Sequence, residues 1–148
     1  MVLRALVETG RDDVEIVLIN TPGPVETSAH LYEFDSVHGR ARGTVSHGEG
    51  WMDVGRGRIA MTHERDPAMI PHADHDVDIV LECSGHFNDR DRSAAHLAAG
   101  AKRVLVSAPC KNADATIVYG VNHDEITADQ LVSSNASCTT NCLAPVAK

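Results

Sequence analysis

Short, almost wholly apolar segments that alternate with helical segments constrain the fold of this chain more than any other feature. Strands are predicted over five such segments: 14–19, 77–83, 103–107, 116–121 and 131–134. Apolar residues at helical spacing predict the helices, over 2–9, 25–34, 89–99 and from Ser137 onward. Strands without a polar face are buried on both sides, and their alternation with helices favours a parallel sheet covered by helices. We therefore expect an α/β fold of the doubly wound kind.

The segment 37–63 departs from this pattern because it is rich in glycine and alternates only weakly. Its apolar residues fit small strands joined by turns. Within it, residues 55–60 match the G-x-G-x-x-A pattern of dinucleotide-binding turns. No buried strand precedes these residues and no helix follows them, so we do not assign the fingerprint there.

Composition excludes several classes of function. The chain has 13 basic and 21 acidic side chains, and its formal charge of −8 leaves no basic face for nucleic acid. The longest apolar runs, about five to seven residues, are too short to span a bilayer, and the first ten residues do not resemble a secretory signal. The spacing of the four cysteines and nine histidines matches neither a disulfide framework nor a zinc site. We expect a soluble, cytoplasmic protein with reduced thiols and no metal, membrane or nucleic-acid partner.

Residues 134–148, SNASCTTNCLAPVAK, carry the clearest chemical signal. A strand ends there and a helix begins near Cys138, so the positive end of the helix dipole favours the thiolate of that cysteine. Ser137 and Thr139 are suited to cap the free N–H groups, or to bind an oxyanion or phosphate. From the residues alone, Cys138 is either a nucleophile or a buried cysteine in a capped turn. Cys142, one turn further along, is expected to pack within the helix.

The segment SCTTNCLAP at 137–145 resembles the active-site segment of phosphorylating glyceraldehyde-3-phosphate dehydrogenases. Five further segments resemble that family in the same order and at matching spacing: 34–40, 63–67, 78–87, 99–109 and 118–123. The erythrose-4-phosphate dehydrogenases are the nearest alternative within the family. The sequences APC at 108–110 and CLAPVAK at 142–148 look more like the glyceraldehyde-phosphate enzymes.

The resemblance implies an N-terminal Rossmann-type domain, a C-terminal catalytic domain and a homotetramer. It also implies the oxidation of an aldehyde phosphate with NAD and inorganic phosphate to give an acyl phosphate. Cys138 matches the nucleophile, whose thiolate adds to the aldehyde before hydride transfer and attack by phosphate on the thioester. Ser137 and Thr139 match residues that hold the substrate or the attacking phosphate.

By the same resemblance, residues at the ends of predicted strands match the cofactor site, as the doubly wound fold leads one to expect. Asn20, Thr21 and Arg65 match residues around the adenosine half of the cofactor. The residues that match the strand ends lining the cofactor groove are Ser84, Gly85, Ser107 and Ala108. Each match has a simpler interpretation. Arg65 could be a solvated charge in a loop, and the two pairs could be only the turns in which strands end.

Thr21 departs from the family pattern, which usually places an acidic residue at this position. A carboxylate accepts hydrogen bonds from the adenosine ribose of NAD and repels the extra phosphate of NADP, whereas a threonine accepts weaker bonds and repels less. We therefore expect a full-length version to bind NAD less tightly and to discriminate less against NADP.

Two further departures concern the ends of the chain. The family's first strand and its glycine-rich turn are not found here, and the sequence stops within the helix that carries Cys138. We expect residues 1–148 to be a partial NAD(P)-binding Rossmann domain, with the junction to the catalytic domain at about 134–148 and that domain absent. No histidine can be assigned as the partner of Cys138, so the isolated chain is expected to be inactive. The alternatives are a nucleotide-binding or interaction remnant and a protein with a reactive thiol that turns nothing over.

Overall fold

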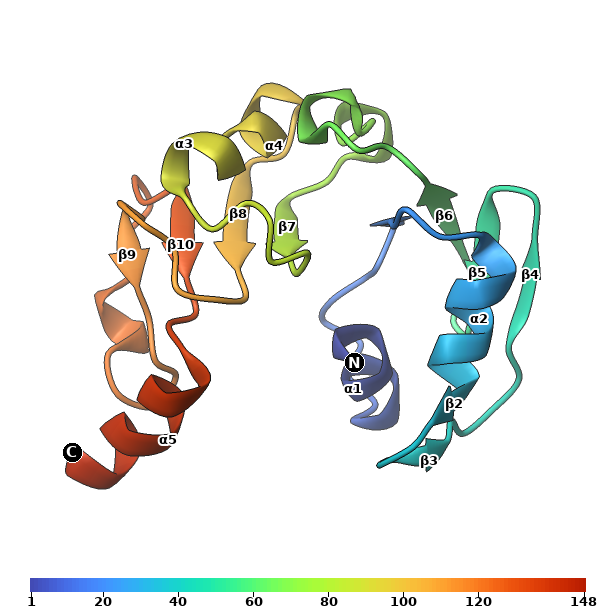
Figure 1. The fold of residues 1–148 in the computed structure, drawn as a ribbon, viewed down its shortest axis with the longest axis horizontal. Coiled ribbons are helices and arrows are strands. Elements are labelled where there is room, and N and C mark those ends of the chain that lie inside the picture. Colours follow the sequence, from blue (N-terminus) through green and yellow to red (C-terminus); the bar gives the residue numbers. More distant parts are fainter. The chain divides into compact units, whose positions relative to one another are not determined.

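The chain is arranged in two compact units, Met1–Asp66 and Pro67–Lys148. The computed structural model describes all residues from Met1 to Lys148, and Figure 1 shows the elements of each unit. Each unit contains its own four-stranded sheet.

The first unit is built around a sheet of mixed direction with the strand order β1-β6-β5-β4. Its strands are β1 (Leu18–Asn20), β4 (Ser46–Gly48), β5 (Trp51–Asp53) and β6 (Arg58–Thr62). Only β1 and β6 run parallel, with Asn20 opposite Thr62, and the other pairs are antiparallel. The unit also holds helices α1 (Val2–Glu8) and α2 (Val25–Glu33) and a short hairpin of β2 (Phe34–Asp35) and β3 (Gly39–Arg40).

The core of this unit lies between α2 and the sheet. Helix α2 buries Val25, Ala29 and Tyr32, whose spacing of four and three places them on one face. They cluster with buried residues of the sheet, among them Met52 and Ile59. The short strands predicted between 37 and 63 are confirmed, and their apolar residues form the wall of this core.

Strand β1 is shorter than the segment 14–19 predicted for it. It begins only at Leu18, which lies opposite Ala60 in β6. Before that point the chain shares a single ladder bond with its neighbour, from the Ala60 N–H to the Val17 carbonyl. A strand needs a paired neighbour, and apolar composition alone does not supply one.

The turn between β5 and β6 confirms that residues 55–60 are not a dinucleotide fingerprint. The Asp53 carboxylate accepts hydrogen bonds from the backbone N–H groups of Gly55, Arg56 and Gly57, at 2.7–3.2 Å. Gly55 and Gly57 have φ angles of 89° and 98°. The glycines therefore serve a hairpin closed by an aspartate.

The second unit contains an all-parallel sheet with the strand order β7-β8-β10-β9. Its strands are β7 (Ile79–Glu82), β8 (Arg103–Val106), β9 (Ala115–Thr116) and β10 (Val132–Ser134). Its helices are α3 (Arg90–Ser93), α4 (Ala95–Ala98) and α5 (Cys138–Ala147), with single turns η1 (Pro67–Met69), η2 (Ala73–His75) and η3 (His123–Glu125). Val104, Val106 and Val132 are almost wholly buried at its centre, as expected for strands covered on both faces.

Two predicted elements of this unit differ in the structure. The strand predicted over 116–121 is reduced to Ala115–Thr116, because the Asn122 side chain accepts the Val118 N–H and donates to the Thr116 carbonyl. These bonds replace strand pairing with a turn. The helix predicted over 89–99 is divided at Ala94 into α3 and α4.

The architecture is a partial Rossmann-type α/β fold. Strand β1 pairs with β6 alone and β7 pairs with β8 alone, so each strand has one unpaired edge. No helix of the chain combines the length and the apolar composition that crossing a bilayer demands.

Candidate active and cofactor-binding sites

The adenosine-side residues of the first unit lie where the parallel strands β1 and β6 end. Asn20, the last residue of β1, accepts hydrogen bonds from the Thr62 hydroxyl at 2.9 Å and from the Glu64 N–H at 2.8 Å. Its Nδ2 donates to the Glu64 carbonyl at 2.9 Å. The Asn20 amide therefore makes three hydrogen bonds within the protein, and it holds the loop after β6 against the end of β1.

Thr21 and Arg65 are the members of this group that remain available to a ligand. Thr21 is held by its backbone, because its N–H donates to the Thr62 carbonyl and its carbonyl contacts His63 Nδ1 at 2.8 Å. Arg65 follows Glu64 in the loop that Asn20 fixes, and its side chain is exposed. A hydroxyl and a guanidinium at the carboxyl ends of parallel strands suit the ribose and phosphate groups of a dinucleotide.

In the second unit, the predicted groove residues follow directly after two neighbouring parallel strands. Ser84 and Gly85 come after β7, and Ser107 and Ala108 come after β8. The Ser107 N–H donates to the Glu82 carbonyl at 3.0 Å, which continues the ladder between the two strands. The structure therefore brings the two pairs to one edge of the sheet.

The loop after β7 is fixed by its own hydrogen bonds. The Ser84 hydroxyl accepts the His86 N–H at 3.1 Å, and Asn88 Nδ2 donates to the Gly85 carbonyl at 3.0 Å. Gly85 has a φ of 76°, and a Cβ added there would meet no atom within 4 Å. The glycine is needed for its backbone conformation, and the space beside it stays open to a ligand.

The turn from β10 into α5 places Cys138 at the start of that helix. Ser137 is the N-cap, and its Oγ accepts the Thr140 N–H at 3.0 Å. Asn141 Nδ2 donates to the carbonyls of Asn135, at 2.7 Å, and Ser137, at 2.9 Å, so the helix holds the turn that precedes it. Cys138 is the first residue of α5 and is exposed, so it is not a buried cysteine in a capped turn.

Ser137 and Thr139 lie together in this capped turn. Ser137 Oγ is 3.0 Å from Thr139 Oγ1 and 2.7 Å from Thr140 Oγ1. Three hydroxyl groups at a helix N-terminus can rearrange to donate to a phosphate or an oxyanion. Two of these residues, Ser137 and Thr140, line an open hollow of about 540 Å³, whose lining also includes Ser134, Lys111 and Asn88.

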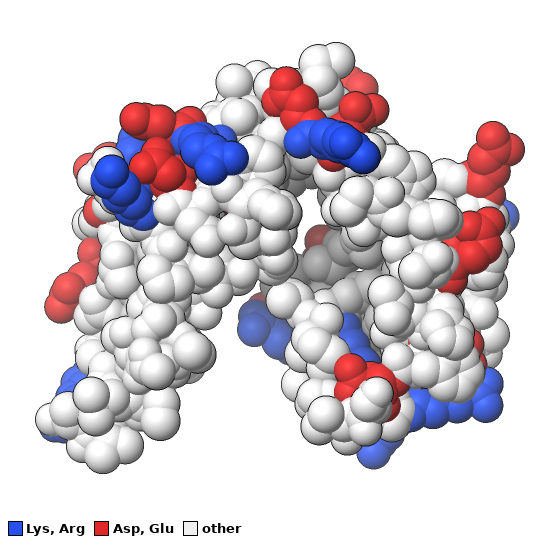
Figure 2. Space-filling model, in the orientation of Figure 1, with Lys and Arg blue, Asp and Glu red and all other residues white.

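An ion pair lies beside the amino ends of β9 and β10. Arg90 Nε donates to Asp114 Oδ1 at 2.7 Å, and together with the Val132 N–H it lowers the pKa of that carboxyl. Figure 2 shows acidic and basic side chains mixed over the end of this unit that carries α3, whereas the visible surface around α5 has few charges. Burial and the nearby Asp89 raise the pKa of the Cys110 thiol, so Cys110 is a poor competitor for reagents that attack thiolates.

Two features of this region were missed in the sequence. Ala136, which precedes the helix cap, is buried and has a φ of 57°. Residues other than glycine rarely adopt this backbone conformation. Glu82, His96 and His72 form a buried polar chain next to the loop after β7. Neither feature has a spacing signal in the sequence. A charged residue at the end of an otherwise apolar strand, as in LEC at 81–83, was the only sign of the second.

The fold and the groups at the strand ends define a dinucleotide-binding protein of the Rossmann type. Comparison with known families makes this specific. The family described as "Glyceraldehyde 3-phosphate dehydrogenase, NAD binding domain" matches residues 1–90, and the chain belongs to that family.

The relatives with high identity carry the same name. The chain is 64% identical to a glyceraldehyde-3-phosphate dehydrogenase of Xanthobacter flavus and 63% identical to one of Cereibacter sphaeroides, each over 147 residues. It is 52% identical to one of Pseudomonas aeruginosa over 149 residues. Each match covers 99% of this chain and 44% of the relative, so the chain spans less than half the length of these curated relatives.

Proposed function

We propose that this chain is the cofactor-binding part of an NAD-dependent, phosphorylating glyceraldehyde-3-phosphate dehydrogenase, with Cys138 as its nucleophile. The observation that carries the proposal is the capped turn from β10 into α5, which presents an exposed thiol at a helix N-terminus. The family match and the relatives support the reaction class. The partner molecules are an aldehyde phosphate and inorganic phosphate, and the assembled enzyme is a homotetramer.

The chemistry assigned to the chain's own residues begins at the thiol. The Cys138 thiolate adds to the aldehyde carbon to give a thiohemiacetal oxyanion, which becomes a thioester when hydride leaves the same carbon. NAD, when bound, supplies the acceptor for that hydride. Inorganic phosphate then attacks the thioester carbon, which releases the acyl phosphate and restores the thiolate. Ser137 and Thr139 hold the phosphate or the developing oxyanion through their hydroxyl groups.

Each unit holds its own group of residues proposed to contact the cofactor. Thr21 and Arg65 take the adenosine portion of NAD, while Asn20 positions the loop that carries Arg65. In the second unit, the strand-end residues Ser84, Gly85, Ser107 and Ala108 line the cofactor groove. With Thr21 in place of an acidic residue, NADP is a second candidate cofactor.

Selective alkylation tests the role assigned to Cys138. The four thiols are treated briefly with iodoacetamide near neutral pH, and the modification of each is measured by peptide mass spectrometry. The helix dipole is worth about 1 kcal/mol, so we expect Cys138 to react about five-fold faster than Cys142, one turn along the same helix. A Cys142→Ser variant is the control and should leave the rate at Cys138 unchanged. Equal rates at both cysteines would contradict the assignment.

Titration with NAD tests the cofactor site. Amide signals in the nuclear magnetic resonance spectrum should move for Thr21, Arg65, Ser84 and Gly85 when NAD is added, and those of the β5–β6 turn at 55–57 should not. The turn is a matched control because it is also glycine-rich and lies outside the proposed site. Movement at neither group, or equal movement at the control turn, would exclude specific binding of NAD by this chain.

A further inference from the structure

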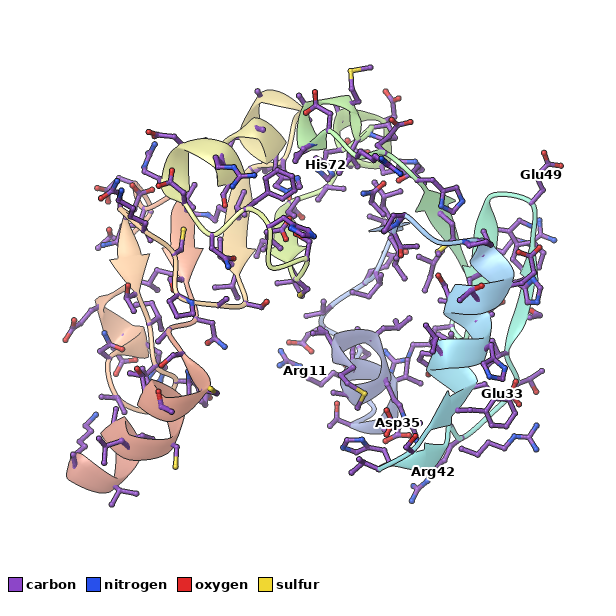
Figure 3. The ribbon with its side chains drawn as sticks, viewed as in Figure 1. Arg11, Glu33, Asp35, Arg42, Glu49 and His72 are labelled. Atoms are coloured by element: carbon purple, nitrogen blue, oxygen red, sulfur yellow. The ribbon has the colours of Figure 1, made fainter.

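Three buried polar side chains form a continuous chain beside the loop that follows β7. Glu82 is the last residue of β7, His96 lies in α4, and His72 lies in the segment before η2, where Figure 3 labels it. Their exposed fractions are 6%, 3% and 4%. The proposed reaction uses none of them, although burying a charged or polar group is costly unless its partners are well placed.

The hydrogen bonds among these three side chains indicate which of their nitrogen atoms carry protons. His96 Nε2 lies 3.1 Å from Glu82 Oε2, and His96 Nδ1 lies 3.0 Å from His72 Nε2. Burial opposes a charge on Glu82, yet the hydrogen bonds from His96 and Ser84 keep the pKa of its carboxyl below the ordinary value. The ionised carboxylate only accepts, so His96 donates from Nε2. In a neutral His96 ring Nδ1 then accepts from His72 Nε2. His72 Nδ1 is then a buried acceptor without a partner.

At the Glu82 end, these buried side chains contact the backbone of the proposed cofactor loop. Glu82 Oε1 accepts the Ser84 N–H at 2.6 Å, a charge-assisted bond. The ring of His96 also meets the ring of Phe87 edge-on, with centroids 6.3 Å apart. Phe87 is held in turn by Ser93, whose hydroxyl donates to its carbonyl at 2.5 Å. His96 therefore supports the loop at both Ser84 and Phe87.

We propose that His96 and His72 are positioning residues that act through Glu82 to hold the Ser84–Asn88 loop in the conformation that binds the cofactor. The inference rests on the function proposed above for Ser84 and Gly85. His96 orients the Glu82 carboxylate towards the Ser84 N–H, and His72 selects the tautomer of His96 that can do so. His75 of η2 lies outside these hydrogen bonds, and its charge contributes to the lowered pKa of His72.

The first test needs no substitution. Nitrogen-15 spectra of the histidine rings in the unmodified chain should show His96 with its proton on Nε2 near neutral pH, and the Ser84 amide proton should lie far downfield, as a carboxylate-bound N–H does. A proton on Nδ1 of His96, or an ordinary position for the Ser84 amide, would overturn the proposal.

The second test compares His96→Leu with His75→Gln. The second variant is a matched control, because it removes a histidine that is not hydrogen-bonded to Glu82 or His96. In His96→Leu we expect the Ser84 amide to move upfield and the dissociation constant for NAD to rise about five-fold, because a charge-assisted bond that orders the loop is weakened. The control should change neither quantity. A Ser84 amide that moves no further in His96→Leu than in the control would overturn the proposal.

The two readouts separate this inference from the proposed function. If the Ser84 amide depends on His96 but the unmodified chain does not bind NAD, the positioning of the loop stands and the cofactor assignment fails. If NAD binds and His96→Leu binds it as tightly as the control does, the cofactor assignment stands and the positioning role is refuted. Should His96→Leu fail to fold, Glu82→Gln supplies the comparison, because a neutral amide leaves the shape unchanged and weakens the bond to Ser84.

Discussion

Acid should destabilise the second unit through His72, and the size of this effect follows from its surroundings. Burial, with smaller contributions from His96 and His75, lowers the pKa of the His72 ring from 6.5 to about 4. The folded chain therefore binds a proton at His72 less readily than the unfolded chain does. Stability from this residue is fully present above about pH 6.5 and is lost as the pH falls towards about 4.

The magnitude can be worked from these two pKa values. Between about pH 7 and about pH 5, protonation of His72 in the unfolded chain alone favours unfolding by about 2 kcal/mol. In His72→Gln this contribution disappears, so the variant should lose about 2 kcal/mol less than the unmodified chain over the same interval. His75→Gln, a change of the same kind nearby, should keep most of the dependence on pH, because His75 makes the smallest of the three contributions to the lowered pKa of His72.

Urea unfolding at the two pH values measures the difference. The amide signals of Val104 and Val106 report on the second unit, because both residues are buried in β8. Trp51, the chain's single tryptophan, lies in the first unit, and its fluorescence gives an internal comparison that His72→Gln should leave unchanged. Equal pH dependence of the Val104 and Val106 signals in the unmodified chain and in His72→Gln would refute the reasoning.

Two further substitutions probe the backbone and the cofactor. Gly100→Ala should destabilise the chain by about 3 kcal/mol in urea unfolding, because φ is 107° there and the new Cβ would lie 2.7 Å from the Cβ of Ala73. Gly23→Ala, with open space around it, is the control, and a comparable loss in both would contradict the steric argument. Thr21→Asp should raise the ratio of NAD to NADP affinity about ten-fold, since a carboxylate binds the ribose and repels the extra phosphate. Calorimetric titration of both cofactors checks it, with Thr27→Asp on α2 as control, and an unchanged ratio would disprove it.

The central strands could be predicted from the sequence because burial leaves a direct mark on composition. The segment 103–107 is apolar throughout its middle, and the structure has a strand over Arg103–Val106. The capped start of α5 was also predictable, since Ser137 is a residue type that accepts a backbone N–H. The cap is a local interaction, whereas β8 pairs with the distant strands β7 and β10 and was predictable only because burial left its residues apolar.

Features that depend on distant partners could not be predicted. The segment 14–19 looks like a full strand, but its pairing with β6 begins only at Leu18. The Glu82–His96–His72 chain joins residues 14 and 24 positions apart, and no periodicity relates them. The candidate site shows the same division. Cys138 could be proposed as a nucleophile from the residues next to it in the sequence, whereas the hydrogen bonds that hold Ser84 depend on tertiary packing.

The left-handed backbone at Ala136 limits which residue types can occupy that position of the turn. The residue is 5% exposed, and its φ is 57°. A branched side chain would have to fit both a filled interior and a conformation that it strongly disfavours. Glycine would fit the conformation but would free the backbone two residues before Cys138. Variation at position 136 is thus confined to the smallest side chains, and this restriction falls on a residue that takes no part in the proposed chemistry.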